Sequence, residues 1–117
     1  MNADSLQALT ALVLNHRDER DWAQFHTPKE LAISLTVEAG ELLALMQWQS
    51  GEQLAETLRT RDQKFRDELA DVLHSTLLLA AHLKIDLGAA LNEKLVKDAA
   101  KYPVAKARGK NLKYDQL

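Results

Sequence analysis

Residues 62–83 read DQKFRDELADVLHSTLLLAAHL, and this stretch decides the fold that the sequence predicts. From Leu69 onward, apolar residues occupy nearly every side of a helix, which is typical of a helix buried on several faces. A chain of 117 residues has few other elements with which to cover it. We therefore expect an all-α protomer, a bundle of four to five helices, that is completed by dimerisation.

The segments before residue 62 carry the start and stop signals of further helices. Ser5 can cap a first helix, and residues 22–27 read as a loop. Thr27 followed by Pro28 is a cap residue and then the favoured first position of a second helix. This helix is expected to run to about Gln49. Residues 52–60 are polar and predict either a short helix or a loop.

The segment after residue 83 predicts one more helix and a tail. Asp86 can cap this helix, and Tyr102-Pro103 closes it. The tail, residues 104–117, is expected to be extended and basic. The sequence shows no internal repeat and no low-complexity tract, so residues 1–117 are expected to form a single domain.

Composition and charge exclude several classes of function. The net charge of −2 gives no general attraction to a nucleic acid polymer, and the absence of Cys excludes disulfides and thiolate metal sites. The first residues lack the basic start of a signal peptide. His82 and Lys84 interrupt the longest apolar run, which is too short to span a membrane. We expect a cytoplasmic protein without membrane or nucleic acid partners.

Two pairs of acidic residues are the candidate functional centre. Glu38 and Glu41 are three residues apart, as are Glu68 and Asp71, so each pair shares one helix face within apolar sequence. If the two helices pack antiparallel, as a short connection favours, the pairs can face each other. Carboxylates without His or Cys favour Mg²⁺, or Mn²⁺, over zinc. The alternative is that these acids are solvated and form surface ion pairs.

Three stretches together resemble a known family: residues 20–48 (RDWAQFHTPKELAISLTVEAGELLALMQW), 66–87 (RDELADVLHSTLLLAAHLKIDL) and 92–110 (NEKLVKDAAKYPVAKARGK). They resemble the MazG-like all-α nucleotide pyrophosphohydrolases, in particular the compact dCTP pyrophosphatase branch. The resemblance implies a homodimer or a homotetramer built as a dimer of dimers. It also implies Mg²⁺-dependent hydrolysis of nucleoside triphosphates between the α and β phosphates. Such an enzyme releases monophosphate and pyrophosphate, and it would remove surplus or non-standard dNTPs.

The resemblance also assigns roles to particular residues. It implies that Glu38, Glu41, Glu68 and Asp71 are the metal ligands and catalytic residues. Trp22 and Trp48 resemble the base-binding aromatic residues of the dCTP branch. Apart from the resemblance, His26 is expected either to contact the ligand or orient its loop, or to form a structural hydrogen bond. The remaining residues expected at the substrate are Lys94, Asp98, Lys101, Tyr102 and Arg108, of which the basic ones suit the β and γ phosphates. A solvated basic helix end is the alternative for the lysines.

Two residues depart from the pattern of the dCTP branch, and two other functions remain open at this stage. Ser75 stands where Tyr is common, and Asp98 stands where Asn is common, which favours a broader dNTP range. One alternative is a di-metal carboxylate bundle, because Asp71 and His74 form a D-x-x-H motif. The other is a non-catalytic helical oligomer or adaptor. His74 and His82 are expected to serve core or interface hydrogen bonds.

Overall fold

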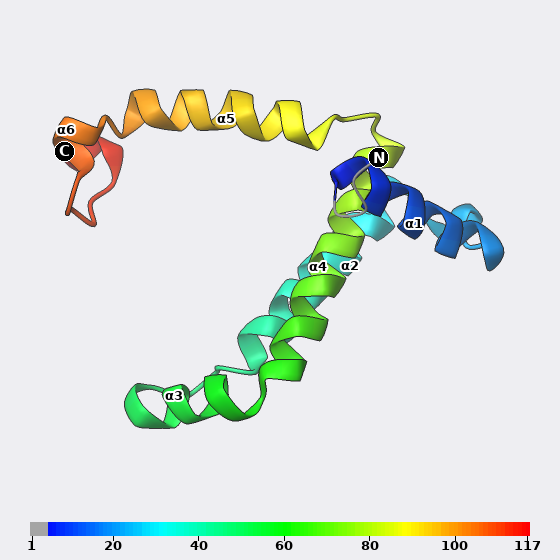
Figure 1. The fold of residues 1–117 in the computed structure, drawn as a ribbon, viewed down its shortest axis with the longest axis horizontal. Coiled ribbons are helices and arrows are strands. Elements are labelled where there is room, and N and C mark those ends of the chain that lie inside the picture. Colours follow the sequence, from blue (N-terminus) through cyan, green and yellow to red (C-terminus); the bar gives the residue numbers. More distant parts are fainter. Residues whose placement is uncertain (1–4) are drawn as a thin grey trace. The chain divides into compact units, whose positions relative to one another are not determined.

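The computed structural model describes residues 5–117, and within this range it contains helices and no strands (Figure 1). The all-α prediction is therefore confirmed. The elements are α1 (Leu6–Glu19), η1 (Ala23–Phe25), α2 (Pro28–Ala44), α3 (Gly51–Thr60), α4 (Asp62–His82), α5 (Leu87–Lys101), α6 (Val104–Ala107) and η2 (Tyr114–Gln116), where η marks a 3-10 helix. The chain forms two compact units, Met1–Lys84 and Ile85–Leu117, which are described separately.

Side-chain caps fix the starts of the helices where the sequence predicted them. The Ser5 hydroxyl accepts a hydrogen bond from the Ala8 N–H (3.1 Å), and the Thr27 hydroxyl accepts one from the Glu30 N–H (3.2 Å). Pro28 occupies the first turn of α2, where its missing N–H removes no helical hydrogen bond. These bonds satisfy backbone donors that a helix start otherwise leaves without a partner.

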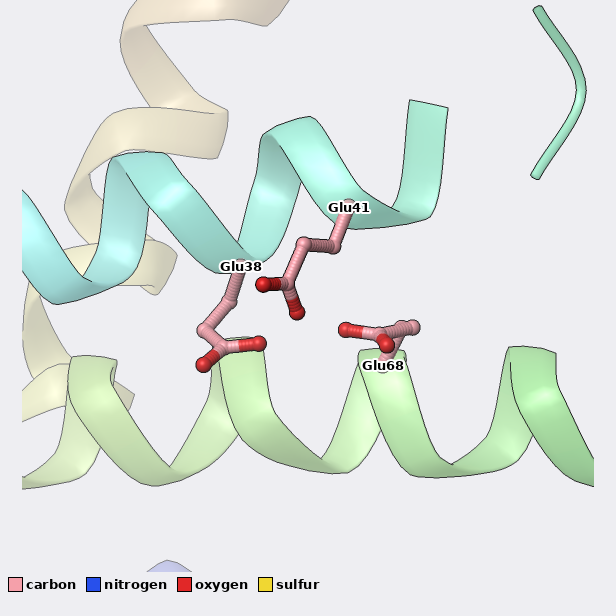
Figure 2. A group of neighbouring side chains, drawn as sticks. All are labelled: Glu38, Glu41 and Glu68. Carbon is pink, nitrogen blue, oxygen red and sulfur yellow. The ribbon is translucent and has the colours of Figure 1, made fainter. Parts of the chain in front are cut away.

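The core of the first unit lies where α2 and α4 pack side by side, running in opposite directions (Figure 2). Its buried apolar residues are Leu31 of α2 and Leu77, Leu78 and Ala80 of α4. Helix α1 also packs against α4. One apolar side of the first half of α4 stays open within the protomer, where Leu69 is 56% and Leu73 is 41% exposed. This exposed apolar side agrees with the expected second subunit, which remains a prediction.

One element boundary differs from the prediction, and one open alternative is decided. Helix α2 ends at Ala44 and not at about Gln49, because residues 45–48 form turns with shorter-range bonds, such as Met46 N–H to Leu43 O (2.9 Å). Trp48 closes these turns with a φ of 67°, in the left-handed region. Residues 51–60 form helix α3, so the helical alternative for this polar segment is the one that the structure adopts.

The second unit contains the predicted fourth helix and a tail that is only partly extended. The Asp86 carboxylate accepts a hydrogen bond from the Ala89 N–H (3.0 Å), and α5 ends at Lys101, just before Tyr102-Pro103. The prediction of an extended tail is wrong at α6 and η2. Pro103 suits the start of α6 because a cap residue needs no N–H, and Gly109, with a φ of 73°, follows its end.

Leu77 gives a test of the packing between α2 and α4. It is 2% exposed, so Leu77→Ala should lower the free energy of unfolding by about 2–5 kcal/mol through lost burial and a residual cavity. Leu12→Ala is the matched control, because Leu12 is 63% exposed, and it should cost less than about 1 kcal/mol. Urea denaturation at one fixed protein concentration measures both. Equal losses for the two variants would contradict this core.

Candidate functional site

Three of the four predicted acids meet between α2 and α4. Figure 2 shows Glu38 and Glu41 extending from α2 toward α4, from which Glu68 faces them. One carboxylate oxygen from each of the three lies within 4.8 Å of the others. The spacing of three residues along α2 and the antiparallel packing of α4 produce this cluster, which we call the acid trio.

Asp71, the fourth acid, lies outside the acid trio but acts on it electrostatically. It is exposed and follows Glu68 by three residues on α4. Its negative charge is one of the causes that raise the pKa of Glu38, so its carboxylate lies within electrostatic range of the trio. The structure therefore groups the four acids as three in contact range and one beside them.

Burial and mutual repulsion keep the acid trio from being fully ionised on its own. Burial, helped by the neighbouring Glu41 carboxyl and the charge of Asp71, raises the pKa of Glu38 from 4.5 to about 7. Burial and the charge of Glu41 also raise the pKa of Glu68. Near neutral pH the trio therefore holds a proton on Glu38 in part of the molecules unless a cation compensates its charge.

The acid trio has the unmet bonding capacity that a hard cation would satisfy. The Oε2 atoms of Glu38 and Glu68 are buried, and neither has a hydrogen-bond partner among the described residues. Such an oxygen is costly without a donor or an ion. All the atoms available as metal ligands are carboxylate oxygens, which suit a divalent cation of the Mg²⁺ class. Glu38, Glu41 and Glu68 are the residues that would hold this ion.

Ring side chains lie near one end of this centre. The Trp22 ring, just before η1, is edge-on to the His16 ring at 5.9 Å between centroids, and His16 is edge-on to His74 at 5.7 Å. His26 keeps a buried Nδ1 atom without a partner among the described residues. His16 was not predicted from sequence, because its ring contacts join the end of α1 to α4 and no helical spacing links His16 to His74.

Trp48 does not lie where its predicted position on the helix would place it. It was expected on the same face of the second helix as Glu41, but it falls in the turns after α2 and is 91% exposed. The argument from a shared helix face is therefore wrong. Its role at the base stays a prediction.

The remaining predicted substrate residues belong to the second unit. Lys94 forms an ion pair with Asp98, and this ion pair offsets the negative charge of the Asp98 carboxylate. The Lys101 Nζ atom lies 4.9 Å from the centre of the Tyr114 ring, and the Tyr102 and Tyr114 rings meet edge-on. Arg108 is exposed at the end of α6. The roles of these residues toward substrate stay predictions.

Comparison with known proteins gives this centre a family. The sequence profile of the MazG-like family matches residues 33–117, a span that contains the four acids and the basic second unit. The chain belongs to the MazG-like family. Its curated relatives include dCTP pyrophosphatase 1 of Rattus norvegicus and of Homo sapiens, each 36% identical over 115 residues, with coverage of 97% of this chain and 68% of the relative.

A solved structure agrees with the MazG-like assignment. A pyrophosphatase from Archaeoglobus fulgidus is similar with a TM-score of 0.79 and 36% identity, covering 84% of this chain and 92% of that one. The resemblance seen in the sequence is confirmed, and the chain is a nucleotide pyrophosphohydrolase of a metal-dependent type. The two other functions, a di-metal bundle protein and an adaptor, gain no support from these relatives. Among residues 5–117, no helix has the length and apolar character needed to cross a bilayer.

Proposed function

We propose that this MazG-like protein hydrolyses deoxynucleoside triphosphates, dCTP among them, to the monophosphate and pyrophosphate with Mg²⁺ as the cofactor. The acid trio carries the proposal, since its two buried oxygens, which have no partner within residues 5–117, suit an ion that also binds phosphate. The relatives named dCTP pyrophosphatase 1 support a deoxycytidine nucleotide as one substrate. Mn²⁺ prefers similar ligands and is expected to replace Mg²⁺.

The four acids have two proposed roles at the α phosphate: three would hold the ion, and one would act on the attacking water. Glu38, Glu41 and Glu68 would hold the ion, which when bound supplies positive charge for the phosphate oxygens and lowers the pKa of water. Asp71 lies outside the trio, and no hydrogen bond among the described residues engages its carboxylate. We assign Asp71 to orient the attacking water and accept its proton, next to the ion. Pyrophosphate then leaves from the α phosphorus.

The charge of the second unit suits the leaving group. Lys94, Lys101 and Arg108 supply positive charge for the β and γ phosphates, and Arg108 has the geometry for two parallel hydrogen bonds to one phosphate. Exposed apolar residues on α5, such as Leu91 (60%) and Val96 (73%), support a homodimer or homotetramer. We place the enzyme in the cytoplasm, where it would remove surplus or non-standard dNTPs.

A panel of the four dNTPs and four NTPs with Mg²⁺, separated by ion exchange, tests the reaction. We expect monophosphate and pyrophosphate in equal amounts, with dCTP among the best substrates and dNTPs preferred over NTPs. Omitting the metal and adding EDTA should abolish the reaction. Without an ion, the carboxylates of the acid trio would repel the negatively charged triphosphate. Appearance of diphosphate and orthophosphate would contradict cleavage between the α and β phosphates.

A further inference from the structure

A row of ring side chains leads away from the acids within the first unit. Asp71 and His74 are three residues apart on α4, about 4.5 Å along the helix axis. From His74 the row continues to His16 at 5.7 Å and then to Trp22 at 5.9 Å, each distance measured between ring centroids. A nucleotide has the same order of parts, since the sugar and then the base follow the α phosphate.

The two histidines have free bonding capacity. Neither imidazole takes part in a side-chain hydrogen bond within residues 5–117, although His16 is exposed and His74 is half-buried. Burial and the adjacent His16 imidazole lower the pKa of His74, so its ring is neutral at pH 7. A neutral imidazole offers one N–H donor and one nitrogen acceptor, which complement the polar edges of a nucleobase or a sugar hydroxyl.

Core or interface hydrogen bonding, the role expected for His74 from sequence, accounts less well for this row. No side-chain hydrogen bond engages the His74 ring among the described residues, and Trp22 is 44% exposed at the outer end of the row. An exposed indole beside an exposed imidazole instead provides a stacking surface next to a hydrogen-bonding group. Arg20 lies 5.8 Å from the Trp22 ring and supports its orientation.

We propose that His16 and His74 are specificity-determining residues that recognise the nucleoside part of the substrate. His74, beside Asp71, lies at the sugar, and His16 together with Trp22 lies at the base. This inference rests on the proposed function, because the acid trio must hold the α phosphate for the row to meet the nucleoside. A site that hydrogen-bonds its ligand discriminates strongly against analogues that leave its polar groups without partners.

Trp22 fluorescence reports on this end of the site directly. The chain has two tryptophans, so Trp48→Phe leaves Trp22 as the only one, and every further variant is made in that background. Titration with dCMP, dTMP, dAMP and dGMP in Mg²⁺ should quench Trp22, with dissociation constants that depend on the base. Inorganic pyrophosphate serves as the probe for the phosphate side, measured by calorimetry.

His16→Phe keeps a ring against Trp22 and removes the nitrogens. His74→Leu removes the nitrogens at the inner position and leaves an apolar side chain in place of the ring. Each should weaken monophosphate binding about tenfold, and His16→Phe should reduce the differences among the four bases. Pyrophosphate binding should stay within twofold. His74→Gln, which restores a donor and an acceptor, should recover most of the loss and is the second variant if His74→Leu fails to fold. His82→Leu, on the same helix but outside the row, is the matched control and should change neither ligand's affinity.

The outcomes separate this inference from the proposed reaction. If quenching depends on the base and is lost in His16→Phe, but no dNTP is hydrolysed, the proposed reaction would be contradicted and the nucleoside site would be supported. If dNTPs are hydrolysed but the base preferences and dissociation constants are unchanged in His16→Phe and His74→Leu, the inference would be overturned and the proposed reaction would be supported. An equal loss of monophosphate and pyrophosphate binding would also overturn it, because it would indicate a structural role.

Discussion

Replacing Glu41 with Gln is expected to lower kcat/KM for the best dNTP by at least about 100-fold. Gln keeps the shape of the side chain but removes one of the three carboxylates whose oxygens lie within 4.8 Å of one another. The ion would then be held by fewer charges, and the triphosphate would lose its compensation at the α phosphate. The loss should appear in kcat as well as in the Mg²⁺ concentration for half-maximal activity.

Glu52→Gln is the matched control for this variant. Glu52 is an exposed acid in the first turn of α3, outside the acid trio, and its replacement should change kcat/KM by less than about twofold. The melting temperature of Glu41→Gln without metal should equal or exceed that of the unaltered protein, because one repelling charge is gone. If Glu41→Gln hydrolyses the substrate at the rate of the unaltered protein, the assignment of Glu41 as a metal ligand would be contradicted.

The meeting of the acids was predictable because it depends on local rules. A spacing of three residues puts Glu38 and Glu41 on one face of α2, and a short connection leads to an antiparallel α4 that carries Glu68. Capping by Thr27 was predictable for the same reason, since a hydroxyl at that position reaches the N–H three residues on. These features need no knowledge of distant contacts.

Other features depend on contacts or on backbone conformations that spacing does not encode. The sequence predicted a helix to about Gln49, yet α2 ends at Ala44 and Trp48 adopts a left-handed conformation that non-glycine residues rarely take. The ring of His16 meets that of His74 across two helices, so no periodicity in the sequence reveals it. The acid trio was therefore easier to predict than the ring contacts around His16, which loops and tertiary contacts build.

The affinity for Mg²⁺ is expected to rise about tenfold per pH unit from pH 5 to about 7 and then to level off. Because burial raises the pKa of Glu38 to about 7, ion binding below that pH must displace a proton from the acid trio. Calorimetry in two buffers of different ionisation enthalpy should show about one proton released per Mg²⁺ at pH 6 and close to none at pH 8.5. Zero release at pH 6 would contradict a protonated Glu38.

The same proton makes the stability of the metal-free protein fall as pH rises. Glu38 has a pKa of about 7 when folded against 4.5 for an ordinary glutamate, so between these values the folded state binds more protons than the unfolded state. Its contribution is present in full below pH 4.5 and is lost as pH rises through 7. After allowance for partial exposure, this amounts to about 1–2 kcal/mol, or several degrees of melting temperature.

Thermal unfolding from pH 5 to 8.5, in EDTA and in Mg²⁺, measures this effect. In EDTA the melting temperature should fall with rising pH, and Mg²⁺ should raise it most at high pH, where the ion binds the ionised acid trio without displacing a proton. Glu38→Gln is the control, because a neutral amide cannot titrate, and it should remove most of the pH dependence in EDTA as well as most of the stabilisation by Mg²⁺. A melting temperature in EDTA that rises between pH 5 and 8, or a Glu38→Gln profile that matches the unaltered protein, would mean that the acid trio is ionised without an ion. Its buried oxygens would then need another source of compensation.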